Sequence, residues 1–218
     1  MKPESGAGTS SGLGKGRIEA LSDGVFAIAM TLLVLDLKPP TVEPGGGRWE
    51  LLAKLVSLWP RGLTYVISFL VLGGNWVAQH SQLHYVRHSN RTYLWMNLLY
   101  LMLISAVPFS AGVLGQSPSE PVAITLYSVN LTLAGCVLYA QLWYAAGPGR
   151  LFVPDIDPKL VLWGGRRIMM GPALYVLATL VSFVRPSLGF SVCVVTPLLY
   201  MIPGRVDRYW RQGHRTTT

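Results

Sequence analysis

The chain has 218 residues, of which 51% are hydrophobic and only 13% are charged, and its formal net charge is +8. Average globular domains carry about 25% charged residues, so this composition disfavours a soluble protein and favours one that has the lipid bilayer as its solvent. The basic residues are dispersed among loops rather than clustered in one fold, so we expect no nucleic acid among the partners.

Both ends of the chain differ in composition from the part between them. Residues 1–14 are rich in Gly and Ser, which predicts a disordered N-terminal tail. Residues 206–218 contain three Arg and predict a basic C-terminal tail. Between these tails we expect one transmembrane domain, over residues 15–205.

We predict that this domain is all-α, with six transmembrane helices. The first runs from Arg17 to Lys38, which corresponds to roughly 33 Å at about 1.5 Å per residue and is enough to span a bilayer. Pro39 and Pro40 end it, and residues 49–57 could form a short interfacial helix before the second span. The other five spans are predicted from intervals without Lys, Arg, Asp or Glu, at 62–86, 92–119, 121–149, 168–184 and 186–204.

The distribution of basic residues predicts the orientation in the membrane. With six spans, the side that holds both termini carries thirteen of the 18 Lys and Arg residues. Cytoplasmic loops carry the excess of Lys and Arg in membrane proteins. We therefore expect a multi-pass membrane protein with both termini in the cytoplasm.

Three histidines follow one another at the end of the second span. His80, His84 and His88 recur every four residues and therefore lie on one helical face. Two His at this spacing can bind zinc, but no Glu or Cys accompanies them. The alternative is the polar cytoplasmic end of a helix with one His turned inward, and we predict no metal site.

One face of the first helix forms a continuous stripe. At 100° per residue, seven side chains fall on or beside one line: Arg17, Leu21, Gly24, Ile28, Thr31, Leu32 and Leu35. From the sequence alone, ordinary helix packing explains such a stripe better than a specialised surface does. Asp23 lies on the opposite side, among bulky apolar residues.

Ser22 and Asp23 are polar residues near the beginning of this apolar helix. They could cap the helix N-terminus, or they could belong to a buried polar network, because an unpaired polar group in an apolar medium is costly. For a network, the candidate partners of Asp23 are Trp76, His80, Asn97 and a backbone amide. The residues alone leave both possibilities open.

At these positions the chain resembles the transmembrane protein 175 potassium channels of the prokaryotic type. The first-helix pattern R-x-x-x-L-S-D over residues 17–23 resembles the family's R-x-x-x-F-S-D, with Leu21 in place of Phe. Trp76 and His80 resemble the W-x-x-H-H region, in which Gln79 stands at the position of the first His. L-W-M-N-L-L at 94–99 and V-P-F-S at 107–110 resemble the third helix.

The resemblance implies a potassium-selective cation channel that has no T-V-G-Y-G filter, and that string does not occur here. It implies a homotetramer in a bacterial plasma membrane, with the first helices lining a central pore. The implied pore constriction consists of Ile28, Thr31, Leu32 and Leu35, with Gly24 also lining the pore. The implied structural network consists of Arg17, Ser22, Asp23, Trp76, His80 and Asn97. Monovalent cations, potassium first, would be the permeant species, and no cofactor is expected.

Three other classes of protein remain as alternatives, and one of them, a structural or accessory membrane protein, is not distinguished by any sequence pattern. A proton- or solute-coupled transporter usually has polar groups at the middle of broken helices, whereas the middle of the first span is apolar. A membrane enzyme needs converging ionisable groups, and those available lie near the cytoplasmic edge. We therefore predict that the protein is not an enzyme.

Overall fold

The structure, a computed structural model, describes residues 15–41, 47–153 and 156–201. The predicted tails, 1–14 and 206–218, lie outside the described residues. The described elements are α1 (Lys15–Leu32), η1 (Leu33–Asp36), α2 (Arg48–Ser57), α3 (Trp59–Tyr85), α4 (Arg91–Ser105), α5 (Val107–Gln116), α6 (Pro121–Ala146), α7 (Pro158–Ser182) and α8 (Pro186–Met201).

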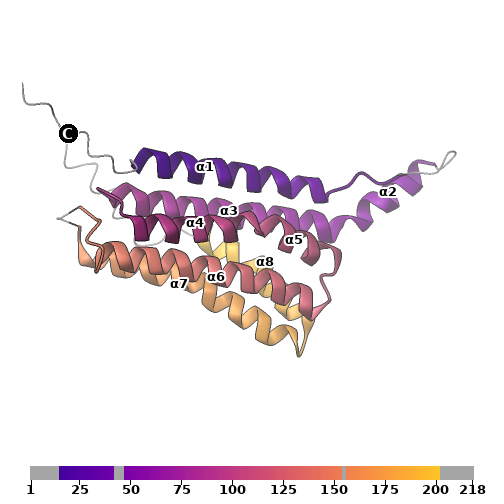
Figure 1. The fold of residues 1–218 in the computed structure, drawn as a ribbon. Coiled ribbons are helices and arrows are strands. Elements are labelled where there is room, and N and C mark those ends of the chain that lie inside the picture. Colours follow the sequence, from indigo (N-terminus) through magenta and orange to yellow (C-terminus); the bar gives the residue numbers. More distant parts are fainter. Residues whose placement is uncertain (1–14, 42–46, 154–155, 202–218) are drawn as a thin grey trace, which may run out of the picture.

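The long helices run side by side and alternate in direction along the chain (Figure 1). α1 lies at one edge of this bundle, where it packs on α3, α4 and α5. α6, α7 and α8 pack together on the other side, and α8 also contacts α3. α2 projects from one end of the bundle. Among the described residues, one long face of α1 is therefore left without a neighbour.

Proline and capping residues explain where several helices begin. α3, α6 and α7 each have a proline within the first two positions, where its missing N–H costs nothing. Asn90 caps α4 by accepting a 2.9 Å hydrogen bond from the Tyr93 amide. The expected third span is divided at Ala106 into α4 and α5, and Pro108 occupies the first turn of α5.

The structure supports an all-helical membrane fold. Three stretches are long and apolar enough to cross a bilayer, namely Lys15–Asp36, Arg91–Gln116 and Pro121–Ala146. α2 and α3 pass the same test together as a pair bent by 46°, and α8 is a shorter apolar helix. The predicted short helix at 49–57 is α2. Within the described residues, length and composition thus establish three spans, or four if the bent pair counts as one, whereas the sequence predicts six.

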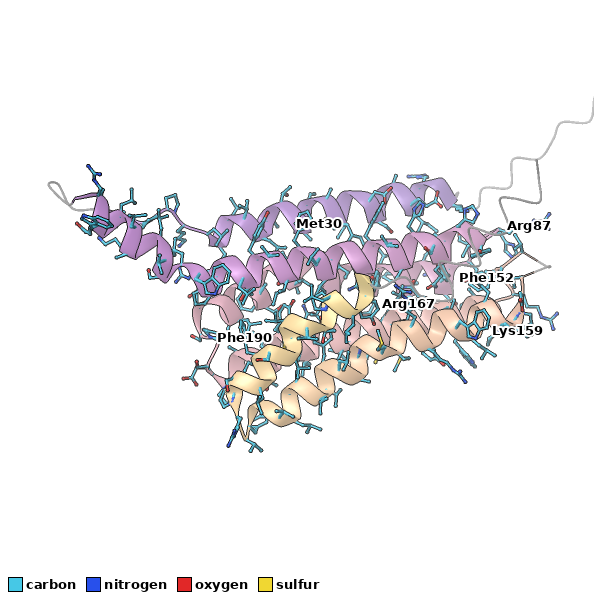
Figure 2. The ribbon with its side chains drawn as sticks, turned by 180° about the vertical axis from the view of Figure 1, so that it is seen from behind. Met30, Arg87, Phe152, Lys159, Arg167 and Phe190 are labelled. Carbon is cyan, nitrogen blue, oxygen red and sulfur yellow. The ribbon has the colours of Figure 1, made fainter. Side chains whose placement is uncertain are left out.

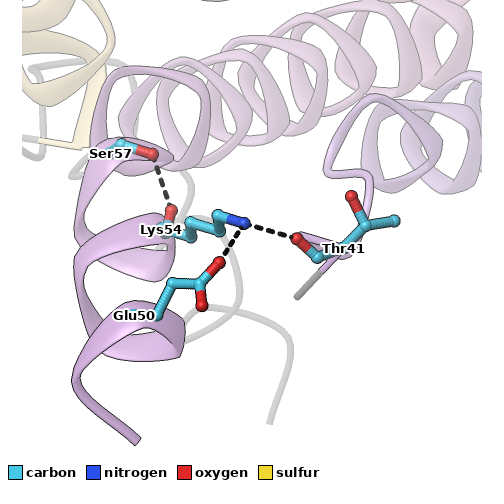
Figure 3. Close-up of polar contacts among 4 residues, drawn as sticks. All are labelled: Thr41, Glu50, Lys54 and Ser57. Atoms are coloured by element: carbon cyan, nitrogen blue, oxygen red, sulfur yellow. Dashed lines mark hydrogen bonds and ion pairs between the residues drawn. The ribbon is translucent and has the colours of Figure 1, made fainter. Parts of the chain in front are cut away.

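α2 is connected to the segment that follows η1 (Figure 3). The Lys54 ammonium donates to the Thr41 carbonyl at 2.8 Å and to a Glu50 carboxylate oxygen at 2.6 Å. The Ser57 hydroxyl donates to the Lys54 carbonyl at 2.7 Å, at the end of the helix. These contacts fix how the chain returns from α1 toward α3.

The opposite end of the bundle is closed by the segment between α6 and α7. The Arg87 amide donates to the Leu151 carbonyl at 2.9 Å, and the Val153 amide donates to the Tyr85 carbonyl at 3.0 Å. The apolar residues beneath it form a cluster with the beginning of α1: Ile18, Leu83, Val86, Tyr93, Leu142, Ala145, Leu151 and Phe152. The ends of α1, α3, α4 and α6 are thereby held in one layer.

Candidate pore-lining face and polar cluster

α1 has one buried face and one exposed face. The buried residues follow helical spacing and continue into η1: Ile18, Ser22, Phe26, Ala29 and Leu33. Phe26 packs against the ring of Tyr100 on α4, with ring centroids 6.1 Å apart. These contacts attach α1 to the rest of the chain, and they determine which side chains point away from it.

The exposed face contains all seven residues of the predicted stripe. Ile28 is 61% exposed and Leu35 is 67% exposed, although both are large apolar side chains. Leu21 and Leu32 are 47% and 42% exposed, and Arg17, Gly24 and Thr31 are also exposed. A contiguous apolar surface of this kind marks a contact with lipid, with another chain or with a pore.

Leu35 lies on this face in η1, where the helix tightens. In η1 the chain makes three residues per turn rather than 3.6, so side chains three residues apart are eclipsed. Leu32 and Leu35 are three residues apart and therefore point the same way. The Thr31 hydroxyl donates to the Ile28 carbonyl at 2.8 Å, which leaves its oxygen as an acceptor on the exposed side.

A buried polar cluster connects the other face of α1 to α3 and α4. The Gln79 amide nitrogen donates to the Asn97 carbonyl oxygen at 2.7 Å and to the Ser22 hydroxyl at 3.2 Å. The Asn97 amide nitrogen donates to the same hydroxyl at 3.5 Å. The three side chains are almost fully buried, so each hydrogen bond offsets a desolvation cost. Ser22, Gln79 and Asn97 form what we refer to below as the polar cluster.

Asp23 lies beside this cluster but on the exposed side of the contact between α1 and α3. It accepts a 2.8 Å hydrogen bond from the Trp76 indole nitrogen. The Trp76 ring in turn stacks on the His80 ring, with centroids 5.5 Å apart and planes 26° apart. α1 begins at Lys15, so Ser22 and Asp23 lie inside the helix and do not cap its N-terminus.

The structure brings most of the predicted network residues together, with two differences. His80 is exposed and reaches the network through Trp76, whereas its neighbour Gln79 supplies the buried hydrogen bonds. Arg17 is exposed in the first turns of α1 and has no hydrogen bond or ion pair with any described residue. Gln79 was not among the predicted network residues, although an amide on the buried face of α3, between Leu72 and Leu83, was the available signal.

Asp36 ends η1 and contacts α5. The Gln116 side-chain amide donates to its carboxylate at 3.3 Å. The same carboxylate lies over Gly112, where an added Cβ would be 3.2 Å from its oxygen. The end of η1 is therefore docked on α5.

The three histidines do not converge. The His80 ring stacks on Trp76, and the His84 ring meets the Tyr85 ring edge-on. No group of three potential metal ligands occurs within 15–41, 47–153 and 156–201.

Comparison with known proteins identifies relatives that are named as ion channels. The family model described as endosomal/lysosomal potassium channel TMEM175 matches residues 17–108. A potassium channel of Streptomyces collinus is 36% identical over 189 residues, which cover 85% of this chain and 90% of that protein. The human endosomal/lysosomal proton channel TMEM175 is 28% identical over 88% of this chain but only 40% of its own length.

The fold has a solved counterpart. The crystal structure of a lysosomal potassium-selective channel TMEM175 homolog from Chamaesiphon minutus superposes with a TM-score of 0.74 at 33% sequence identity. The match covers 86% of this chain and 96% of the other. The likeness therefore extends over the whole helical bundle.

Proposed function

Since the chain belongs to the TMEM175 family of ion channels, we propose that it is a potassium-preferring cation channel in which the exposed face of α1 lines a central pore. We propose that the pore is formed by four copies of the chain, each contributing one α1. The observation that carries this proposal is the exposure of Ile28, Leu32 and Leu35 on a helix whose opposite face is fixed by buried contacts.

The proposed constriction is apolar. Four copies of Ile28, followed by Leu32 and Leu35, would make successive apolar rings, and such rings block ions by losing water unless they widen. Gly24 precedes them, and an added Cβ there would have nothing within 4 Å, so the described residues leave the face open at that level. No T-V-G-Y-G string is present to supply a ring of carbonyls.

Selectivity in such a pore depends on dehydration. Ile28 has no oxygen to replace the water around an ion, and a potassium ion gives up water more readily than a sodium ion does. The Thr31 hydroxyl donates its proton to the Ile28 carbonyl, so its oxygen can accept a cation next to the constriction. Pore width and this oxygen together would favour potassium.

The polar cluster and Asp23 have a structural role in this proposal. They bind α1 to α3 and α4 on the side away from the exposed stripe. A pore helix must keep its register so that equivalent residues of four subunits meet at one level. We assign Ser22, Asp23, Trp76, Gln79 and Asn97 to this positioning.

We further propose that residues 15–205 form one six-span channel domain of a bacterial plasma membrane, with both termini in the cytoplasm. The proposed spans are α1, α3, α4 together with α5, α6, α7 and α8. They alternate in direction, so that the first begins and the last ends at the same end of the bundle (Figure 1). Basic residues gather at the bundle end where α1 begins: Lys15, Arg17, Arg87, Arg91, Arg150 and Lys159. This is the charge excess expected on the cytoplasmic side.

The test is ion flux into liposomes that contain only this protein. We expect potassium to enter faster than sodium under equal gradients, and flux to rise with concentration without early saturation. A strict requirement for a second solute or a proton gradient would instead identify a coupled transporter. Protein-free liposomes are the control, and a pH-sensitive dye inside the same liposomes measures any proton flux.

A further inference from the structure

A second feature of the bundle lies away from the exposed face of α1. A cavity of about 430 Å³ opens between α3 and α7, with its floor on α6. α8 packs on both α3 and α7 and separates them, but it has only 16 residues whereas α3 has 27. Past the end of α8, no described helix fills the space between α3 and α7. Figure 2 shows this place: α8 ends beside Arg167, and Phe152 lies further along the bundle, toward Arg87 and Lys159.

The lining of this cavity is predominantly apolar, and glycines keep it open. Gly74 on α3 and Gly164 on α7 line it from the two sides. A Cβ added at Gly74 would meet nothing within 4 Å, and a Cβ added at Gly164 would meet the Leu142 side chain at 3.9 Å, which is ordinary contact. Pockets that bind small molecules have volumes of this order and a largely apolar lining. The cavity therefore suits a ligand that is mostly hydrocarbon.

The cavity is continuous with the outer surface of the bundle. Phe69 and Val77 line it, and both are large apolar side chains that are also exposed. Together with Gly73 they recur every four residues, so they form one edge of α3 along the opening. The bilayer around a membrane-spanning helix presents hydrocarbon chains to such an edge. A lipid chain can therefore enter the cavity from the side.

One hydroxyl in the lining is left without a hydrogen bond to any described residue. Hydroxyls inside these helices commonly donate to a carbonyl of the preceding turn, as Thr196 does to Val192 at 2.7 Å. Ser81, which is partly buried on α3, makes no such bond with a described residue, and its oxygen remains accessible. Arg167 also lines the cavity, but its guanidinium already donates to the Tyr200 carbonyl at 2.8 Å. The polar group that is available to a ligand is therefore the Ser81 hydroxyl.

The position of Ser81 along α3 matches the edge of one leaflet. Ser81 is nine residues from Leu72, at the middle of α3, which corresponds to about 14 Å at about 1.5 Å per residue. The hydrocarbon core of a bilayer extends about 15 Å to either side of its middle. When α3 crosses the bilayer symmetrically, Ser81 lies where the glycerol esters of one leaflet begin. From Ser81 to Phe69 the lining continues for about 18 Å, which is close to the depth of that leaflet.

We propose that this cavity binds one acyl chain of a bilayer glycerolipid, whose ester carbonyl accepts a hydrogen bond from the Ser81 hydroxyl. The lipid belongs to the leaflet at the end of the bundle where α1 begins, because the Lys15 ammonium on α1 donates to the His84 carbonyl near the same end of α3. The apolar lining selects the chain, and the hydroxyl selects the ester. The proposal requires that α3 crosses the bilayer, and it does not depend on which ion the protein conducts.

The test is native mass spectrometry of the full-length protein in detergent, titrated with two phosphatidylcholines that carry the same chains, one through ester bonds and one through ether bonds. An ether has no carbonyl, so we expect the ester lipid to bind about fivefold more tightly, which is the effect of one neutral hydrogen bond. Ser81→Ala should make the two affinities equal. Ser105→Ala removes a hydroxyl that donates to the Met102 carbonyl outside the cavity, and it should leave the ester preference intact.

A second pair of variants tests the cavity itself. Gly74→Leu places a side chain in the cavity and should abolish the ester preference, whereas Gly62→Leu makes the same change outside the lining and should not. Equal binding of the two lipids by the parent protein, or an ester preference that survives Ser81→Ala or Gly74→Leu, would overturn the proposal. So would a Gly74→Leu effect on oligomer size alone, which would mean that a second copy fills the space. An ester preference that appears only after residues 206–218 are removed would also overturn it, because the chain's own C-terminal segment would then be the occupant.

Discussion

The indole nitrogen of Trp76 donates a 2.8 Å hydrogen bond to the carboxylate of Asp23, and this contact joins α3 to α1 on the exposed side of their interface. Asp23 directly follows Ser22, whose buried hydroxyl accepts a hydrogen bond from Gln79. Buried and exposed polar contacts thus meet at the same turn of α1, so their contributions can be separated by substitution.

Asp23→Ala should weaken assembly more than permeation. The variant loses one hydrogen bond at an exposed position, for which we expect a cost of about 1 kcal/mol. The fraction of tetramer, measured by chemical cross-linking and gel filtration, should fall while the potassium-to-sodium ratio of the remaining channels stays the same. Trp76→Phe removes the donor of the same hydrogen bond and should lower the fraction of tetramer by a similar amount. A normal tetramer with altered selectivity would contradict the positioning role.

Gln79→Leu should be more damaging than the adjacent His80→Leu. The first change leaves the buried Asn97 carbonyl oxygen without its donor and leaves the Ser22 hydroxyl with only the 3.5 Å contact from the Asn97 amide, at a cost of about 1–3 kcal/mol. The second alters an exposed ring that stacks on Trp76 and should cost much less. Thermal unfolding in detergent measures both. Gln79→His, which supplies a ring nitrogen as a donor, should recover part of the loss. If the two Leu variants lower the unfolding temperature equally, the buried hydrogen bonds of Gln79 do not stabilise the protein more than the His80 ring does.

Ile28→Asn should increase conductance and lower potassium selectivity. An amide in place of an apolar ring allows the proposed constriction to stay wet, so dehydration no longer discriminates between ions. Flux in liposomes should rise, and the potassium-to-sodium ratio should fall toward about one. Val129→Asn makes the same kind of change on an exposed position of α6 and serves as the control. If currents through Ile28→Asn equal those of the parent, Ile28 does not line the constriction.

Gly135→Ala should destabilise the bundle although alanine favours helices. An added Cβ would lie 2.5 Å from Cγ of Pro172 on α7, so the two helices would have to separate. Overpacking of this kind costs about 1–3 kcal/mol, more than the gain in helix propensity. The midpoint of thermal unfolding should fall for Gly135→Ala and should not fall for Gly74→Ala, where the space is open. A rise in both would mean that α6 and α7 are less closely packed.

The exposed face of α1 could be predicted from the sequence because helical periodicity alone determines which residues share a side. The predicted stripe from Arg17 to Leu35 is the face that the structure leaves uncovered. Leu35 lies on this face by the same periodicity, although it belongs to η1, where the helix turns more tightly than a uniform 100° step assumes. Periodicity also could not say whether lipid, protein or water covers this face.

The polar cluster could be predicted only in part. Asn97 and Ser22 were candidates because polar groups in an apolar helix need partners, but the choice between Gln79 and His80 depends on the rotation of α3. That rotation is set by packing against α1, α2, α5 and α8, which no local pattern contains. The cavity beside α8 was not predictable for the same reason, because it results from the relative lengths and spacing of helices that are distant in the sequence.

Ile28 lies between two polar attachments of α1 to its neighbours, and this has a mechanical consequence. Near one end, Ser22 and Asp23 hold the helix on α3 and α4, and near the other, Asp36 holds it on α5 through Gln116. Between them, the described residues of α1 make apolar contacts with neighbouring helices, such as Phe26 with Tyr100, and no side-chain hydrogen bond to them. A rod supported at both ends deflects most near its middle, and Ile28 lies six residues from Ser22 and eight from Asp36. A small force that bows α1 therefore displaces Ile28 furthest, while both ends keep their positions.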